Sequence, residues 1–197
     1  MHGLVNRSIQ RFVQGTYGDD AWAEICRASD LGFENFESML IYDNAQTNAV
    51  LASACVLLGR SRTGLLEDMG TFLVSHPDFN GLRRLLRFGG DTFDEFLHSL
   101  DDLHDRANLA LPELDFPVLE LREHSASSYS LQYMWRQHGF GALVLGIIRA
   151  MADDYGVLVL LEHSSIQGDD GDFDQISINL LDNDFTDGRD FQLQVGT

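Results

Sequence analysis

The chain has 197 residues, of which 44% are hydrophobic, and it carries a formal net charge of −18. This length and hydrophobic content suit one globular domain or two closely packed lobes. A phosphate backbone would repel so negative a chain, which argues against nucleic acid as a partner. No stretch of about eighteen uncharged apolar residues is present, and the N-terminus lacks the layout of a signal peptide. We therefore expect a cytoplasmic protein without a membrane span.

The first half of the chain is predicted to be helical. Apolar residues recur every three or four positions in residues 2–15, 45–58 and 62–75. Asp19 or Asp20 can cap a further helix that runs through Trp22. The two cysteines, Cys26 and Cys55, are expected to be small buried hydrophobes in a reducing compartment.

Residues 91–110 predict the most informative helix. Asp91 or Thr92 can cap this helix, and Glu95 stands near the capping-box position. Apolar residues recur through the segment at helical spacing, whereas His98 faces the opposite side. The segment is therefore expected to present one buried stripe and one exposed face.

The pattern changes from helical to alternating after Pro112. Strands are expected in residues 118–122, 131–135, 157–163, 175–181 and 191–195, with a turn at 125–128 and an apolar helix at 139–155. The predicted architecture is α+β, with an N-terminal helical lobe packed on a lobe of helices and an antiparallel sheet of four or slightly more strands.

His104 lies on the apolar stripe of the 91–110 helix and allows two interpretations. It is either a neutral core histidine with a hydrogen-bonded ring or an axial metal ligand. Neutral imidazole is a good ligand for iron, and one proximal histidine often holds haem iron. No His, Cys or Glu lies three or four residues beyond it at zinc-like spacing, and Asp101 alone does not make a zinc site. The residues alone leave both interpretations open.

Several segments, in order along the chain, carry a family resemblance. They are MHGLVN at 1–6, YGDDAW at 17–22, IYDNAQT at 41–47, FLHSLDDLHD at 96–105, LDFPVLELR at 114–122, LQYMWRQHGF at 131–140 and GIIRAMADDYG at 146–156. Through them the chain resembles the H-NOX (haem-nitric oxide/oxygen binding) family, and in particular the haem domain of the soluble guanylate cyclase beta subunit. The resemblance covers about residues 1–180 and implies that His104 is the proximal ligand of haem iron.

The same resemblance implies where the cofactor lies. Haem b, iron protoporphyrin IX, would be buried between the two lobes of a single 1–197 domain. The helical subdomain would span about 1–60, and the subdomain of the ligand helix and the sheet about 61–197. Pro117 matches the proline that packs on the haem plane. The distal side would be lined by four aliphatic residues, namely Val5, Leu73, Leu143 and Ile147.

The aliphatic distal lining favours nitric oxide over dioxygen. A dioxygen ligand gains from a hydrogen-bond donor, and omitting the donor costs about 1–3 kcal/mol. Oxygen-binding members of the family place a tyrosine on the distal helix, and the matching position here is Leu143, beside Ala142. We therefore expect NO to be the ligand, with CO weaker and dioxygen excluded.

The motif that holds the haem propionates departs from the family pattern. The family has Tyr-x-Ser-x-Arg, and the corresponding residues here run from Tyr133 to Gln137. The tyrosine is kept, but Trp135 replaces the serine and Gln137 replaces the arginine. Arg136 lies one residue before the position of the arginine, and on a strand its side chain would therefore project from the opposite face. Arg136 could reach round through a bulge, or Gln137 and His138 could donate instead. Without the bidentate arginine, haem would be held less strongly.

The resemblance implies a haem-based NO sensor that signals in trans to a separate effector, such as a histidine kinase or a cyclic-dinucleotide enzyme. NO would bind opposite His104 and weaken the iron–histidine bond, which biases a two-state switch. The alternative is a haem-free or weakly haem-binding interaction module of the same fold. No Ser-His-Asp array, phosphate loop or metal-hydrolase motif is present, so an enzyme is not expected.

Overall fold

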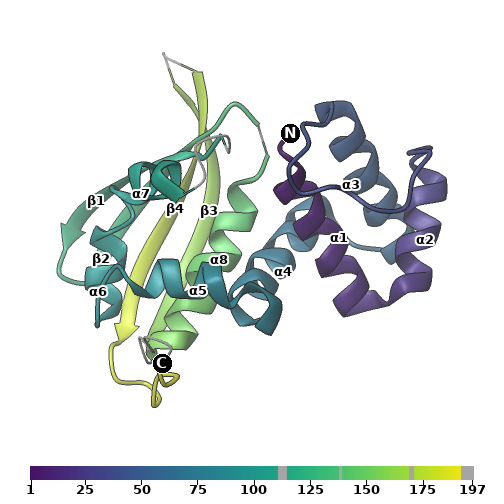
Figure 1. Ribbon diagram of the computed structural model, residues 1–197. Helices are drawn as coiled ribbons and strands as arrows, with labels where there is room; N and C mark the ends of the chain where they lie inside the picture. Colours follow the sequence, from purple (N-terminus) through teal and green to yellow (C-terminus); the bar gives the residue numbers. More distant parts are fainter. Residues whose placement is uncertain (111–114, 138, 169–170, 192–197) are drawn as a thin grey trace. The chain divides into compact units, whose positions relative to one another are not determined.

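The computed structural model describes residues 1–110, 115–137, 139–168 and 171–191. The chain divides into two compact units, Met1–Met69 (unit 1) and Gly70–Thr197 (unit 2) (Figure 1). The division falls inside the fourth helix rather than at the Gly59 turn that precedes it. Helices together with one four-stranded antiparallel sheet confirm the α+β class.

Unit 1 is helical, as its apolar periodicity predicted. It contains α1 (Gly3–Tyr17), α2 (Asp19–Ala28), α3 (Asn44–Leu58) and the first part of α4 (Arg62–Ser75). The apolar stripes of these helices supply its core, in which the most buried side chains include Phe12, Val13, Ile25, Val50, Leu51 and Leu66. No single described helix is both long and apolar enough to cross a membrane, and α3 and α4 meet those criteria only when taken as a bent pair.

The start of α2 differs from the prediction. Gly18 occupies the N-cap position with φ of 92° and makes no side-chain hydrogen bond, so neither Asp19 nor Asp20 is the cap. Both carboxylates lie in the first turn, where the helix dipole favours negative charge. Cys26 is buried and Cys55 half-buried, and both are free thiols.

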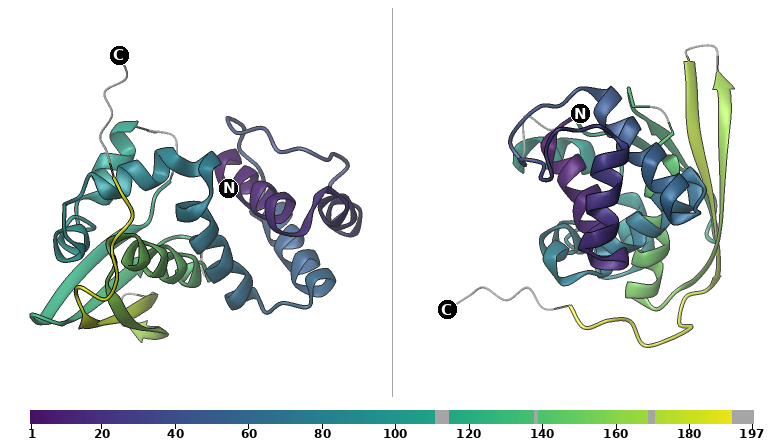
Figure 2. Two further views of the ribbon diagram at one scale, coloured as in Figure 1. Left: turned by 90° about the horizontal axis from the view of Figure 1, so that it is seen from below. Right: turned by 90° about the vertical axis from the view of Figure 1, so that its right-hand side faces the viewer.

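Unit 2 is built on an antiparallel sheet in the order β1–β2–β4–β3. Its elements after α4 are a short 3₁₀ turn (Pro77–Phe79), α5 (Asn80–Arg87), α6 (Phe93–His98), α7 (Leu103–Ala110), β1 (Val118–Ser125), β2 (Ser128–Met134), α8 (Gly141–Tyr155), β3 (Leu158–Gly168) and β4 (Gly171–Asp182). The strands β3 and β4 form a long two-stranded ribbon (Figure 2). Pro112 and the strand expected in 191–195, apart from Phe191, lie outside the described residues.

The inner face of the sheet follows from the period-two alternation of its strands. Tyr133 pairs with Asp174, and Leu131 pairs with Ile176, on the two central strands. Leu131 and Ile176 are fully buried. The helix α8 packs along β3 (Figure 1). The buried alternate positions therefore form the core of unit 2, and Asp174 stands as a polar residue at the end of that face.

The single helix predicted for residues 91–110 is wrong, because the segment forms two helices, α6 and α7, joined by a turn. The capping box of Thr92 and Glu95 is confirmed at the start of α6. Local hydrogen bonds explain the break after Ser99. The Ser99 hydroxyl donates to the Phe96 carbonyl at 2.7 Å, and the Ser99 carbonyl accepts from Arg106 at 2.8 Å. Such bonds compete with continuation of the helix.

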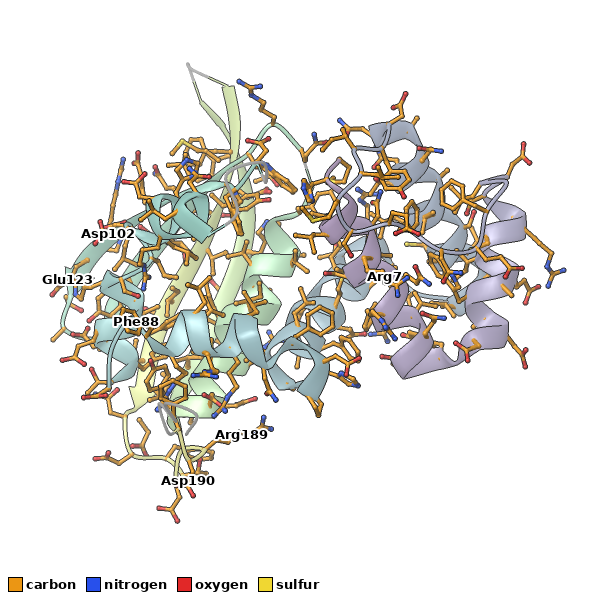
Figure 3. The ribbon with its side chains drawn as sticks, viewed as in Figure 1. Arg7, Phe88, Asp102, Glu123, Arg189 and Asp190 are labelled. Carbon is orange, nitrogen blue, oxygen red and sulfur yellow. The ribbon has the colours of Figure 1, made fainter. Side chains whose placement is uncertain are left out.

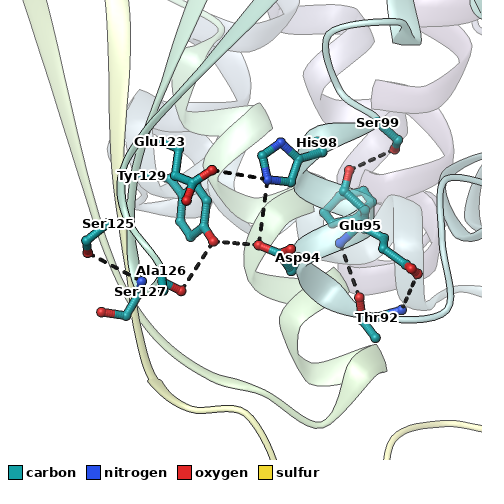
Figure 4. Close-up of polar contacts among 11 residues, drawn as sticks. Thr92, Asp94, Glu95, His98, Ser99, Glu123, Ser125, Ala126, Ser127 and Tyr129 are labelled. Atoms are coloured by element: carbon teal, nitrogen blue, oxygen red, sulfur yellow. Dashed lines mark hydrogen bonds and ion pairs between the residues drawn. The ribbon is translucent and has the colours of Figure 1, made fainter.

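Polar side chains tie α6 to the first two strands of the sheet. The Tyr129 hydroxyl donates to Asp94 Oδ1 at 2.5 Å. His98 Nε2 lies 3.8 Å from Asp94 Oδ1 and 3.6 Å from Glu123 Oε2. Figure 4 shows the His98 ring between the two carboxylates, with the Tyr129 hydroxyl reaching Asp94 from the strand. The element that precedes α7 is thus held against β1 and β2.

Asp154 holds α5 against α8 through its buried carboxylate, and it holds the segment after β4 through its backbone carbonyl. Asp154 is 1% exposed and lies 2.9 Å from Arg83 Nε and 3.8 Å from Arg87 Nε. The Arg87 guanidinium lies 3.9 Å from the centre of the Tyr155 ring. The backbone N–H of Arg189 donates to the Asp154 carbonyl at 2.9 Å. Arg189 therefore lies at the point where the segment after β4 returns to α8 (Figure 3).

Replacing Asp154 with asparagine is expected to lower the free energy of unfolding by about 3 kcal/mol, because two largely buried guanidinium groups lose their counter-charge. Chemical denaturation at neutral pH measures this change. The matched control is Asp68→Asn, which removes the partner of Arg60 in an exposed pair of unit 1 and should cost less than about 1 kcal/mol. Equal effects of the two substitutions would contradict a structural role for Asp154.

Burial, and next the hydrogen bond to Asp94, raise the pKa of Tyr129 from 10.0 to about 12. A group whose pKa is higher in the folded state stabilises fully below its unfolded pKa and loses that contribution as pH rises. The contribution of Tyr129 should therefore be present below pH 10 and vanish by about pH 12.

Denaturation measured across this window should show a shallower loss of stability in Tyr129→Phe than in the natural chain. Tyr155, whose pKa is also raised to about 12, mainly by burial, stays in both proteins, so the difference between them reports Tyr129. Asp94→Asn should shift the phenol absorbance titration to lower pH. An unchanged titration would show that Asp94 does not stabilise the neutral phenol.

Candidate functional site

The ring of His104 is oriented by the backbone of the segment that enters β1. His104 stands in the first turn of α7 and is half-buried. Its Nδ1 lies 3.3 Å from the Pro117 carbonyl oxygen. Because a carbonyl oxygen only accepts, Nδ1 must carry the proton of this hydrogen bond. The Nε2 atom then keeps its lone pair, which is the arrangement that second-shell carbonyls impose on metal-binding histidines.

Two further hydrogen bonds attach this region to the sheet. Asp101 Oδ1, in the turn before α7, accepts from the backbone N–H of Leu121 on β1 at 2.6 Å. Asp115, two residues before Pro117, accepts at Oδ2 from the indole Nε1–H of Trp135 at 3.2 Å. Both sides of the His104–Pro117 contact are therefore joined to strands.

Three of the aliphatic residues singled out in the sequence gather where α4 crosses α8. A Cβ on Gly70 would lie 2.2 Å from the Leu143 carbonyl oxygen and 2.8 Å from the Ile147 nitrogen, so the two helices approach through backbone contact that glycine alone allows. Leu73 lies one turn beyond Gly70 on the same helical face and is buried. Leu143 and Ile147 are half-buried and stand one turn apart on α8. Val5 is half-buried on α1, in unit 1.

Tyr133 opens onto a polar cavity at the end of β2. The cavity has a volume of about 170 Å³ and is lined by Tyr133, Trp135, Gln137, Gly139, Ser165, Phe173 and Asp174. The Tyr133 side chain is buried, and its hydroxyl makes no hydrogen bond to any residue that the structure describes. Burial, followed by the charges of Asp174 and Asp115, raises the pKa of this hydroxyl far above its ordinary value. Tyr133 therefore presents a protonated, unpaired donor.

The residues that follow Tyr133 differ from one another in exposure and in the residues they contact. Trp135 is half-buried and packs edge-on against Phe140, with ring centres 5.3 Å apart. Arg136 is exposed in the bend that follows β2, and the β2–β4 pairing shows no bulge. Gln137 lines the cavity. His138 lies outside the described residues.

A polar group that the sequence did not predict lies beside the first residue of α8. The Ser165 hydroxyl donates to Asp174 Oδ1 at 2.6 Å, and His163 Nε2 lies 3.2 Å from the same oxygen. A Cβ on Gly141 would lie within 2.6 Å of His163 Nε2 and Asp174 Oδ2. Period-two alternation could have placed these residues on the inner face. In the part of the chain that the structure describes, no hydrogen bond joins Ser165 to His163, so the group lacks the serine–histidine contact of a hydrolase triad. Among the described residues no cluster of three or more His, Cys, Asp or Glu side chains could hold a metal ion.

Relatives of the chain are found among soluble guanylate cyclases. It is 24% identical over 170 residues to soluble guanylate cyclase gcy-31 of Caenorhabditis elegans, covering 86% of this chain and 24% of that protein. Soluble guanylate cyclase 89Db of Drosophila melanogaster is 22% identical over 155 residues, which cover 79% of this chain and 23% of that protein. The chain thus spans about a quarter of the length of the curated relatives it matches.

Solved H-NOX structures share the fold. The Fe(II) unliganded H-NOX protein from K. algicida superposes with a TM-score of 0.78 at 18% identity, covering 93% of this chain and 98% of that one. A mutant H-NOX of T. tengcongensis gives a TM-score of 0.78 at 14% identity, with 93% of this chain and 99% of that chain covered. The family model described as Haem-NO-binding matches residues 2–163. The chain therefore belongs to the Haem-NO-binding (H-NOX) family of haem-based gas-sensor domains.

Proposed function

We propose that this chain binds haem b through Nε2 of His104 and senses nitric oxide. The observation that carries the proposal is the hydrogen bond from His104 Nδ1 to the Pro117 carbonyl oxygen, 3.3 Å long, which leaves Nε2 as a lone-pair donor. Haem, if bound, would supply a ferrous iron able to bind a diatomic gas, and His104 would be the residue that holds it. Pro117, half-buried beside His104, would contact the haem plane.

The residues of unit 2 fit haem at the axial position and, in part, at the propionates. The unpaired Tyr133 hydroxyl, facing the cavity, supports a hydrogen bond to a propionate. Trp135 directs its N–H to Asp115, and Arg136 is exposed, so neither side chain replaces the serine and arginine of the family motif. We infer that His104 contributes most of the hold on haem and that propionate anchoring is weaker than in relatives with the full motif.

Ligand choice follows from the aliphatic residues at the α4–α8 crossing. Leu73, Leu143 and Ile147 carry no hydrogen-bond donor, and Val5 of unit 1 carries none either. Nitric oxide needs no donor, whereas dioxygen loses about 1–3 kcal/mol without one. We therefore propose NO as the physiological ligand, CO as a weaker ligand, and no stable binding of dioxygen.

Signalling would start at the His104 ring, which is positioned by α7 and by the Pro117 carbonyl. His104 stands in the first turn of α7 and its ring contacts the Pro117 carbonyl, so a change in what its Nε2 binds would act directly on α7. We propose that the moved helix is read by a separate effector, of the histidine kinase or cyclic-dinucleotide enzyme class. The second candidate, a weakly haem-binding or haem-free interaction module, is favoured by one observation, the exposed position of Arg136 away from Tyr133.

His104→Gly should remove the histidine-ligated ferrous absorbance spectrum and lower haem affinity at least about tenfold, because even the partners of a metal ligand contribute that much. Free imidazole should restore the spectrum by occupying the position that the His104 ring has left. No such restoration is expected if His104 has only a structural role. Absorbance titration of apo-protein with haem measures both effects. Native haem affinity in His104→Gly without imidazole would reject His104 as the ligand.

Leu143→Tyr should give the ferrous protein a spectrum that changes reversibly on exposure to air, since the phenol supplies the missing donor. Dioxygen affinity should rise about tenfold or more over that of Leu143→Phe, which carries the same ring without the hydroxyl. Absorbance at controlled oxygen pressure separates the two variants. A stable oxygen-dependent spectrum in the natural chain would contradict the proposed selectivity.

A further inference from the structure

Trp135 stands where the family motif has a serine, and its indole N–H is bonded to a residue that does not line the cavity. The indole Nε1–H donates to Asp115 Oδ2 at 3.2 Å. The ring is held in place by aromatic neighbours on two sides. Its centre lies 6.4 Å from that of Tyr133 with a 75° angle between planes, and 5.3 Å from that of Phe140 with a 76° angle. A ring fixed in this way holds its N–H in one direction.

The acceptor of this hydrogen bond belongs to the short segment that orients His104. Asp115 lies two residues before Pro117, whose carbonyl oxygen accepts from His104 Nδ1 at 3.3 Å. Proline fixes its own φ and restricts the residue before it to extended conformations. Few backbone torsions are therefore free between Asp115 and the Pro117 carbonyl. A displacement of Asp115 would consequently displace that carbonyl as well.

We propose that Trp135 is a positioning residue for His104. Through Asp115 it holds the Pro117 carbonyl where it fixes the Nδ1–H tautomer and directs Nε2 outward. The inference rests on the proposed role of His104, and it gives the altered family motif a function on the proximal side instead of at the propionates. The chain of contacts runs from the end of β2, through Asp115 and Pro117, to the first turn of α7.

A packing role alone is the alternative, and the two tryptophans of the chain allow a matched test. Trp135→Phe keeps an aromatic ring between Tyr133 and Phe140 but removes the N–H. Asp115→Ala removes the acceptor at an exposed position and leaves the aromatic packing intact. The control is Trp22→Phe, which deletes the indole N–H that donates to the Glu34 carbonyl at 2.7 Å in unit 1.

The first measurement uses the full chain without haem. Nitrogen-15 NMR of the imidazole rings should show His104 in the natural chain as the Nδ1–H tautomer, with well-separated ring nitrogen shifts. In Trp135→Phe and Asp115→Ala the two shifts should move towards each other as the tautomers mix. Trp22→Phe should leave them unchanged. If Trp135→Phe does not fold, Asp115→Ala decides the matter by itself.

The second measurement uses the haem-loaded protein. Both variants should shift the iron–histidine stretching frequency in ferrous resonance Raman spectra and speed haem release about two- to tenfold, the range expected for one lost hydrogen bond. Unchanged His104 ring shifts in both variants would overturn the positioning role even if His104 binds iron. Failure of the natural chain to bind haem would instead reject the proposed function, while the NMR result would still stand.

Discussion

The hydrogen bond between the His104 ring and the Pro117 carbonyl is the contact on which the functional geometry depends. It selects the ring nitrogen that carries the proton and leaves the other with the lone pair that the proposed ligand role requires. It also joins the short helix α7 to the segment that leads into β1.

The fold holds this contact by anchoring the elements on either side of it. The turn before α7 is bonded to β1 through Asp101, and α6 is tied to the sheet through Asp94 and Tyr129. Breaking the helix after Ser99 lets α7 begin afresh, with His104 in its first turn. If α6 had continued as one helix, its rotation would have set the direction of the His104 side chain. The turn instead lets Asp101 bond to β1.

Under the proposed function, the residues that replace the propionate motif would change how this chain holds haem. Tyr133 keeps a buried, protonated hydroxyl over a cavity that also contains Asp174. The nearby charges are negative, so no cation replaces the missing arginine among the described residues that line this cavity. Under the proposed function, such a site would rely mainly on His104, whose ring Trp135 is proposed to position through Asp115.

Local patterns in the sequence determined the α+β class, the helices of unit 1, the hairpin of β1 and β2 and the capping box at Thr92, whereas the ligand role of His104 was implied only by the family resemblance. The predicted elements depend on period, capping and turn chemistry, which act between residues close in the chain. Tertiary structure alone decided the partner of the His104 ring and the meeting of Ser165, His163 and Asp174. Each of these depends on strand register or on hydrogen bonds between distant segments, and side-chain periodicity carries no information about which segments become neighbours.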